Sequence, residues 1–165
     1  MRMNKYAFMA LSLSALLVRS ANGQIAFTTN NTALSGTYGN PSCVVDVNGD
    51  GLDDVIRFSG TQMFIAIQQS GGGFTEHSYG NATVSPNWSI AAGYLNGDGF
   101  ADVLIGNGSA NSFMWSGNNG TTYSETYFAP YIFSQRTNMV DFNNDGLLDA
   151  FSCHDVGLSK PYRNT

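Results

Sequence analysis

The chain has 165 residues, of which 12 are acidic and 7 basic, and only 12% are charged. Three of the basic residues, Arg2, Lys5 and Arg19, lie within residues 1–23, whereas every acidic residue lies beyond that segment. Without it, four basic residues stand against twelve acidic ones, a net charge of −8. Because such a chain repels phosphate backbones and anionic lipids, we expect cations as partners and no nucleic acid.

Residues 1–23 have the pattern of a secretory signal peptide. A basic start is followed by an apolar stretch over residues 6–18 and by small residues at Ala21 and Gly23. The apolar stretch is too short to cross a bilayer, which takes about 20 residues. We therefore expect a mature chain over residues 24–165, secreted or held at the cell surface, with no membrane insertion after signal cleavage.

The composition of the mature chain favours β-structure. Glycine is abundant, with 19 residues, and aromatic residues make up 13% of the chain, as expected for short strands joined by tight turns. Two cysteines, Cys43 and Cys153, are too few for a disulfide framework. Both a single disulfide between them and two buried free thiols remain open at this stage.

One nine-residue pattern, Asp-x-Asn-x-Asp-Gly-x-x-Asp, organises the sequence. Its copies start at Asp46, Tyr94 and Asp141, so that consecutive copies are offset by 48 and 47. Each copy follows a short apolar run and leads into another, which predicts a strand, a loop and a returning strand. A repeat of about 50 residues is the size of a four-stranded propeller blade.

The period predicts an all-β fold, a partial β-propeller of about 2.5 four-stranded blades. The repeats would cover about residues 41–88, 89–135 and 136–165, and the last would lack its final strand. Propellers close with roughly four to eight blades, so these blades cannot close a ring. The chain is then either a piece of a longer protein that continues beyond Thr165 or an open array with exposed edges.

The spacing of the pattern points to calcium, which takes six to eight oxygen ligands. Positions 1, 3, 5 and 9 offer side-chain oxygens, position 6 is a glycine that permits the sharp turn, and position 7 offers a backbone carbonyl. The predicted ligands are Asp46, Asn48, Asp50, Leu52 and Asp54 in the first loop, Asn96, Asp98, Phe100 and Asp102 in the second, and Asp141, Asn143, Asp145, Leu147 and Asp149 in the third. Polar turns without metal are the alternative, but three copies in register argue against it.

The second loop is the weak one, because Tyr94 replaces the first carboxylate. A phenol with a pKa near 10 is a poor calcium ligand at neutral pH, so we expect weak binding or none there. An EF-hand would need a glutamate at position 12 and flanking helices. Position 12 is Arg57, Ile105 or Ser152, and strand-like residues follow, which excludes that alternative.

Residues 89–106, centred on the second loop, closely resemble the FG-GAP repeat, also called the VCBS-type repeat, and the resemblance extends over about residues 41–165. It implies integrin-like β-propeller blades on a secreted or surface protein, with calcium in a structural role. Tyr94 departs from the family's pattern. The signal peptide, together with predicted blades that are rich in asparagine and aromatic residues, also resembles those of exported repeat proteins of Bacteroidetes-type bacteria.

These features favour a calcium-binding repeat module for adhesion or for binding a protein or a carbohydrate. The alternative is a non-catalytic propeller portion of a larger secreted hydrolase or lyase. Four aromatic residues are candidates for stacking on sugar rings or for packing between blades: Trp88, Trp115, Tyr131 and Phe133. Catalysis is not expected, because the chain has only two histidines, His77 and His154, and no nucleophile elbow or zinc pattern.

Overall fold

The computed structural model describes residue 34 and residues 40–128 and 133–165. All these residues belong to one compact unit, which spans residues 31–165. The eleven elements found there are β-strands, and the described residues contain no helix, which confirms the all-β prediction. No helix in this part of the chain is long and apolar enough to span a membrane. The predicted signal peptide and Tyr131 lie outside the described residues.

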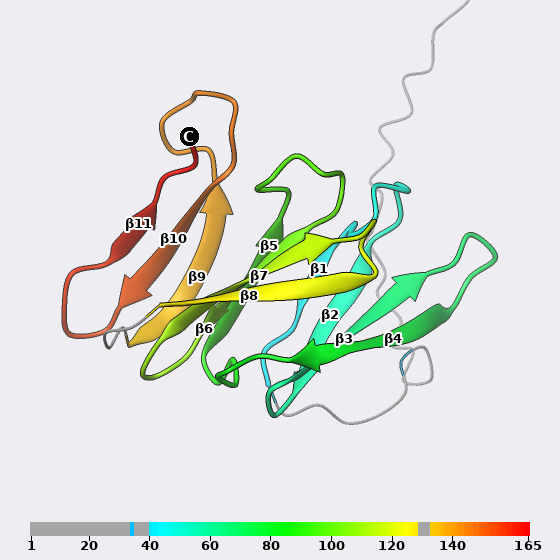
Figure 1. Ribbon diagram of the computed structural model, residues 1–165, viewed down its shortest axis with the longest axis horizontal. Coiled ribbons are helices and arrows are strands. Elements are labelled where there is room, and N and C mark those ends of the chain that lie inside the picture. Colours follow the sequence, from blue (N-terminus) through cyan, green and yellow to red (C-terminus); the bar gives the residue numbers. More distant parts are fainter. Residues whose placement is uncertain (1–33, 35–39, 129–132) are drawn as a thin grey trace, which may run out of the picture. The chain divides into compact units, whose positions relative to one another are not determined.

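The strands form three antiparallel sheets (Figure 1). The first contains β1 (Cys43–Val45), β2 (Asp54–Ser59), β3 (Gln62–Gln68) and β4 (Phe74–Asn81). The second contains β5 (Ser89–Gly93), β6 (Asp102–Gly106), β7 (Asn111–Gly117) and β8 (Thr122–Phe128). The third contains β9 (Ser134–Val140), β10 (Asp149–His154) and β11 (Lys160–Tyr162).

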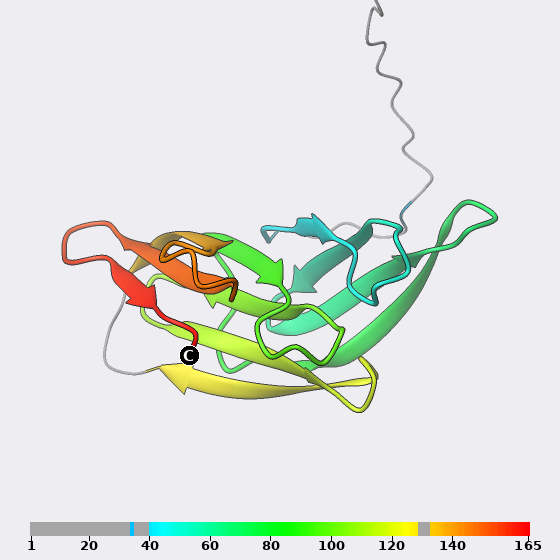
Figure 2. The ribbon, with the colours of Figure 1, turned by 90° about the horizontal axis from the view of Figure 1, so that it is seen from above.

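Each sheet is a meander in which consecutive strands pair, the arrangement expected of a propeller blade. Contacts of β6 with β9 and of β4 with β8 also join neighbouring sheets, but most contacts between sheets run through the first strands, β1 with β5 and β5 with β9. Figure 2 shows these strands along one side, with the outer strands β4 and β8 along the opposite side. In the described residues the third sheet has three strands, as predicted for the incomplete repeat.

Two apolar clusters fill the spaces between neighbouring sheets. The larger lies between the first and second sheets and contains six residues that are fully buried: Ile56, Phe58, Met63, Ile65, Val103 and Ile105. The smaller lies between the second and third sheets, around the buried residues Leu104, Phe113 and Ala150. Neighbouring sheets therefore bury apolar faces against each other, and this burial is the main stabilising contribution to the fold.

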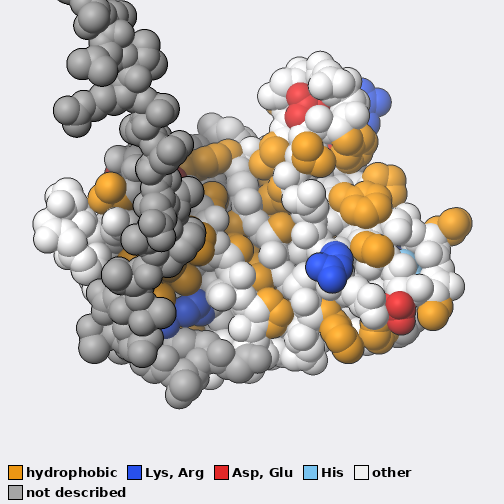
Figure 3. Space-filling model, turned by 180° about the vertical axis from the view of Figure 1, so that it is seen from behind, with side chains coloured by type: hydrophobic (Ala, Val, Ile, Leu, Met, Phe, Trp, Pro, Cys, Tyr) orange, Lys and Arg blue, Asp and Glu red, His pale blue; other side chains and the backbone are white. Residues whose placement is uncertain are grey.

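Close packing between the second and third sheets depends on Gly93 at the end of β5. A Cβ atom on this residue would lie 2.4 Å from Leu148 Cδ2 and 3.2 Å from the thioether sulfur of Met139. A side chain there would push the third sheet away. Charged side chains are sparse on the described surface seen from behind (Figure 3), in keeping with the concentration of carboxylates in the loops.

Both cysteines are free thiols, and both are half-buried rather than buried. The structure therefore has no Cys43–Cys153 disulfide. Burial raises the pKa of the Cys43 thiol to about 12.

Candidate metal centres

The three aspartate-rich loops connect the first and second strands of each sheet. Glycines supply the turns, with φ of 75° at Gly49 and 83° at Gly51 in the first loop and 88° at Gly146 in the third. Only glycine adopts such angles without strain. Asn144 takes φ of 58° where the other two loops have glycine, which asparagine tolerates better than most residues.

In the first loop, the Asp46 carboxylate accepts hydrogen bonds from three backbone N–H groups. Its Oδ1 lies 2.8 Å from the Gly49 nitrogen and 3.2 Å from the Asp50 nitrogen, and its Oδ2 lies 2.8 Å from the Gly51 nitrogen. Asp50 in turn accepts a bond from the Leu52 N–H at 2.8 Å, and its second oxygen accepts one from the Asn48 amide at 3.1 Å. The loop therefore brings the side chains of positions 1, 3 and 5 together.

The third loop repeats this scheme. Asp141 accepts bonds from the N–H groups of Asp145, at 3.2 Å, and Gly146, at 2.9 Å. Asp145 accepts bonds from the Leu147 N–H and the Asn143 amide. These two bonds, the larger effect coming from Leu147, lower the pKa of Asp145, so this exposed carboxylate is firmly ionised.

In the second loop, the hydroxyl of Ser116 lies among the oxygens of three loop residues. The Ser116 hydroxyl oxygen lies 2.7 Å from Asp98 Oδ2, 3.1 Å from Asp102 Oδ1 and 3.4 Å from the Phe100 carbonyl oxygen. These are three of the oxygens predicted to bind the cation. Burial raises the pKa of Asp98, but hydrogen bonds from Ser116, Phe100 and Asn96 outweigh it and lower the pKa overall.

Tyr94 is turned away from its own loop. Its hydroxyl donates a hydrogen bond to the backbone carbonyl of Asp46 in the first loop, and the Ala101 N–H donates to the Val47 carbonyl at 2.9 Å. The position-1 residue of the second repeat thus joins two sheets instead of organising its own loop.

The position-9 aspartates Asp54, Asp102 and Asp149 are fully buried. Each accepts one hydrogen bond from the N–H of position 2 in its loop, namely Val47, Leu95 and Phe142. Each also accepts one, at 2.8 Å, from the N–H of Gln68, Ser116 and Asn164, respectively. These aspartates therefore fasten the loop to the third strand, or to the residues just after it, whatever else they bind.

Burial raises the pKa of Asp54, with added repulsion from Asp50 and Asp46, although two backbone hydrogen bonds oppose the shift. Burial likewise raises the pKa of Asp102. Both shifts express the cost of holding negative charge away from water and beside other carboxylates.

Sequence reasoning missed Gln68, Ser116 and Asn164 as partners of the loops. The three residues are evenly spaced along the chain, at the period of the pattern itself. The regular spacing could therefore have identified them. The three positions hold different residue types, because the hydrogen bond that they share is donated by the backbone N–H and does not require a particular side chain.

The first and third loops fit calcium by the chemistry of their donors, which are all oxygen atoms. Among the described residues, no group of three or more His, Cys, Asp or Glu side chains is placed to hold a metal ion. A cation in these loops would thus also need the asparagine and main-chain oxygens. The candidate ligands of the second loop are already joined by Ser116.

The histidine and the tryptophans that the sequence analysis considered make contacts within the fold. His154 Nδ1 accepts hydrogen bonds from the N–H groups of Val156, at 3.1 Å, and Gly157, at 2.8 Å, so the imidazole organises a turn. Trp88 is 50% exposed and contacts Phe133 with a ring separation of 5.4 Å. Trp115 stacks on Phe113 at 5.1 Å and 15°. The described aromatic candidates therefore do not form one platform.

Three meander sheets, each with an aspartate-rich loop after its first strand, define a partial β-propeller. The family model for the FG-GAP-like repeat matches residues 46–105 and 94–152, more than half of the chain. The chain belongs to the FG-GAP-like repeat family. No protein with curated annotation matches it. FG-GAP repeats are blades of β-propellers, are typically extracellular and generally have no catalytic role.

Proposed function

We propose that this protein is an exported binding module whose first and third loops bind calcium. The observation that carries the proposal is the shared arrangement of these loops, in which positions 1, 3 and 5 converge through the same hydrogen bonds. Calcium there has a structural role, because it ties the first strand of a sheet to the second and offsets the repulsion between carboxylates.

The pKa of Asp54 supports a cation at the first loop. Neighbouring Asp46 and Asp50 raise that pKa further than burial alone, so a divalent cation would stabilise the ionised form of all three. Displacement of backbone N–H groups from the aspartates would accompany binding. The second loop binds calcium weakly or not at all. Tyr94 supplies no carboxylate, and the Ser116 hydroxyl already contacts the carboxylates of Asp98 and Asp102.

The ligand of the module is a protein or a carbohydrate presented outside the cell. The membership of an extracellular repeat family, the acidic mature chain and the predicted signal peptide support this class of function. Adhesion at the cell surface, with the loops and outer strands exposed, fits the same features. The predicted domain arrangement, a signal over residues 1–23 followed by a repeat region, is part of the proposal.

Thermal unfolding in calcium and in a chelator tests the calcium sites. At a calcium concentration 100-fold above Kd, one site adds about 2.7 kcal/mol, which corresponds to a rise in Tm of roughly 5–10 °C. Magnesium should give a smaller rise, because it demands a stricter octahedral geometry. An equal Tm in calcium and chelator would refute the proposal.

Three matched substitutions locate the sites. Asp50→Asn and Asp145→Asn each remove one carboxylate from an exposed position of the first or third loop, and each should lose part of the calcium-dependent rise. Asp98→Asn makes the same change in the second loop and should leave the rise unchanged. The difference between calcium and chelator is compared, so a general loss of stability does not affect the result.

A further inference from the structure

Four asparagines in the described part of the chain are followed by a glycine: Asn48, Asn96, Asn107 and Asn119. In such a pair the backbone nitrogen of the glycine can attack the side-chain carbonyl carbon of the asparagine, because glycine has no side chain to hinder the approach. The reaction expels the side-chain amide as ammonia. In a folded chain its rate depends on how each pair is held, and the four pairs are held differently.

Two of the pairs have little freedom to react. Asn107 is buried, and its amide donates a hydrogen bond to the Ser85 carbonyl at 2.5 Å. Asn119 lies in a turn with φ of 55°, and the following Gly120 packs so closely on Phe100 that a Cβ atom there would lie 2.4 Å from the ring. The backbone at both places therefore has little room to rotate so that the nitrogen meets the carbonyl carbon.

Asn48 and Asn96 stand at position 3 of the first and second loops, and matching side-chain bonds hold them. Each amide donates a hydrogen bond to the position-5 aspartate, Asp50 or Asp98, at 3.1 Å. Each side-chain oxygen accepts a bond from the N–H of that aspartate, at 3.1 Å in the first loop and 3.2 Å in the second. The carbon that would be attacked thus has similar surroundings in both loops.

The attacking nitrogen is held in the first loop but not in the second. The Gly49 N–H donates a hydrogen bond to Asp46 Oδ1 at 2.8 Å. Tyr94 takes the place of this aspartate in the second loop and bonds to the Asp46 carbonyl instead. Among the residues that the structure describes, the Gly97 N–H makes no hydrogen bond. A bound carboxylate opposes the attack, because its bond must first break and its charge disfavours loss of the N–H proton.

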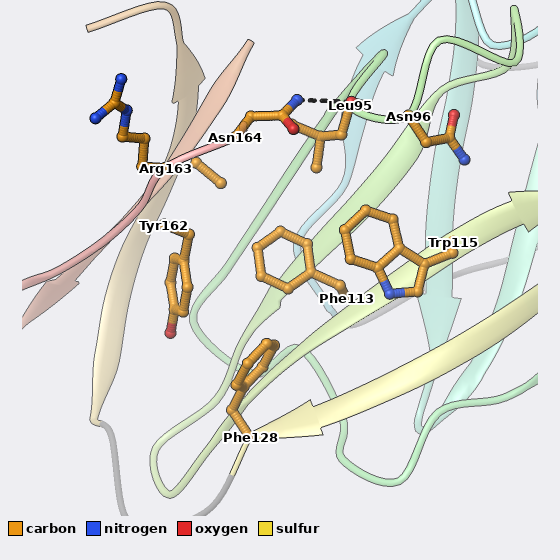
Figure 4. A pocket seen from close by; sticks show the side chains of 9 residues that line it. Leu95, Asn96, Phe113, Trp115, Phe128, Tyr162, Arg163 and Asn164 are labelled. Carbon is orange, nitrogen blue, oxygen red and sulfur yellow. Dashed lines mark hydrogen bonds between the residues drawn. The ribbon is translucent and has the colours of Figure 1, made fainter. Parts of the chain in front are cut away.

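The second of these pairs is also open to water. Asn96 and Gly97 are exposed, whereas Asn48 is half-buried. Figure 4 shows Asn96 at the edge of an aromatic pocket of about 260 Å³, with its amide directed away from the rings. The dashed bond in that view, from the Asn164 amide to the Leu95 carbonyl at 2.7 Å, holds the residue just before Asn96. The loop beyond that residue is exposed as far as Gly99.

We propose that Asn96 is a site of spontaneous deamidation and that the position-1 aspartate protects the equivalent Asn48. The Gly97 nitrogen forms a bond to the side-chain carbonyl carbon of Asn96 and gives its proton to water. The bond from that carbon to the amide nitrogen breaks, and the nitrogen leaves as ammonia with a proton from water. A second water molecule opens the resulting succinimide ring and leaves a carboxylate, on aspartate or on isoaspartate.

The product changes the charge of the second loop. The Asn96 amide lies 3.1 Å from Asp98 Oδ2 and 3.4 Å from Asp102 Oδ1 and donates a hydrogen bond to each. An ionised carboxylate in its place donates to neither and repels both. The second loop therefore gains negative charge as the protein ages, whereas the first loop keeps its asparagine.

Peptide mapping by mass spectrometry measures the deamidation of each asparagine during incubation at neutral pH. Chelator is present throughout, so the result is independent of the calcium proposal. We expect Asn96 to react roughly tenfold faster than Asn48, the ratio that corresponds to one hydrogen bond to a charged acceptor. The temperature is kept where the buried Asn107 stays intact, which shows that the chain remains folded. Equal rates at Asn48 and Asn96 would overturn the proposal.

Exchange of the position-1 residues tests the cause. Tyr94→Asp gives the Gly97 N–H an acceptor and should slow the reaction of Asn96 to the rate of Asn48, whereas Tyr94→Phe provides no acceptor and should not slow it. Loss of stability accelerates deamidation, so it cannot imitate this protection. Asp46→Ala should raise the rate at Asn48 to that of Asn96. An unchanged rate at Asn96 in the Tyr94→Asp chain would overturn the proposal.

Discussion

The hydroxyl of Tyr94 donates a hydrogen bond to the main-chain carbonyl of Asp46, the residue that stands at the same position one repeat earlier. Position 1 thus has two different uses. In the first loop its carboxylate gathers backbone N–H groups, whereas in the second loop its phenol reaches the preceding sheet. Burial, with the charge of Asp46 as the next cause, raises the pKa of Tyr94, so the hydroxyl keeps its proton and remains a donor at neutral pH.

Removal of this hydroxyl should weaken the contact between the first and second sheets. Tyr94→Phe keeps the ring and loses the hydrogen bond, so we expect the free energy of unfolding to fall by about 1 kcal/mol. Urea denaturation measures the change. Tyr127→Phe removes a hydroxyl from a tyrosine that is 45% exposed and serves as the control. Equal stability of Tyr94→Phe and the unsubstituted chain would show that the bond contributes nothing.

Restoration of the missing carboxylate should create a third calcium site. In the double variant Tyr94→Asp and Ser116→Ala, the second loop gains a position-1 ligand and loses the hydroxyl that joins Asp98 to Asp102. Isothermal titration should give about two calcium ions for the unsubstituted chain and about three for the variant. Three equal tight sites without any substitution would contradict the account of the second loop.

The buried position-9 aspartates should matter for stability even without calcium. Asp54→Asn puts an NH₂ group where both oxygens now accept backbone N–H groups, and one donor then loses its partner at a cost of about 1–3 kcal/mol. The neighbouring Asp53→Asn changes an exposed residue and should cost nearly nothing. Urea denaturation in chelator compares the two variants. A similar loss in both would mean that the charge of the loop, and not the buried hydrogen bonds, decides.

Cys43 should make stability fall at alkaline pH. Burial raises its pKa from 9.0 to about 12, so the folded state disfavours the thiolate. The contribution of Cys43 is therefore complete below about pH 9 and is lost as the pH rises from about 9 to about 12. The loss is at most about 4 kcal/mol, and the partial exposure of the residue makes it smaller.

The measurement compares the pH dependence of unfolding of the unsubstituted chain and of Cys43→Ala. Other groups titrate in the same range, including Tyr123, whose pKa burial also raises. The difference between the two curves isolates Cys43, because these groups are common to both chains. Parallel curves between about pH 9 and pH 12 would refute the prediction.

The loops and the fold class were open to prediction because their signals are local. A turn with glycine at a fixed place and oxygen-bearing residues at alternate positions lies within one short pattern, and the strands around it show their apolar runs directly. Because the pattern occurs three times, the prediction made for one loop applied to all three. The same local comparison identified the second loop as different, since the tyrosine at its first position is visible in the sequence alone.

The sequence by itself determined that this is an all-β chain of FG-GAP-like repeats with three loops, two of which have an aspartate or asparagine at positions 1, 3, 5 and 9 of the pattern. Only the tertiary structure decided that Ser116 enters the second loop, that Tyr94 serves the first, and that the position-9 aspartates bind N–H groups 14 or 15 residues away. The physical reason is that these bonds join groups brought together by strand pairing and sheet packing. No spacing within a single loop records which backbone N–H or carbonyl from another strand will lie beside it.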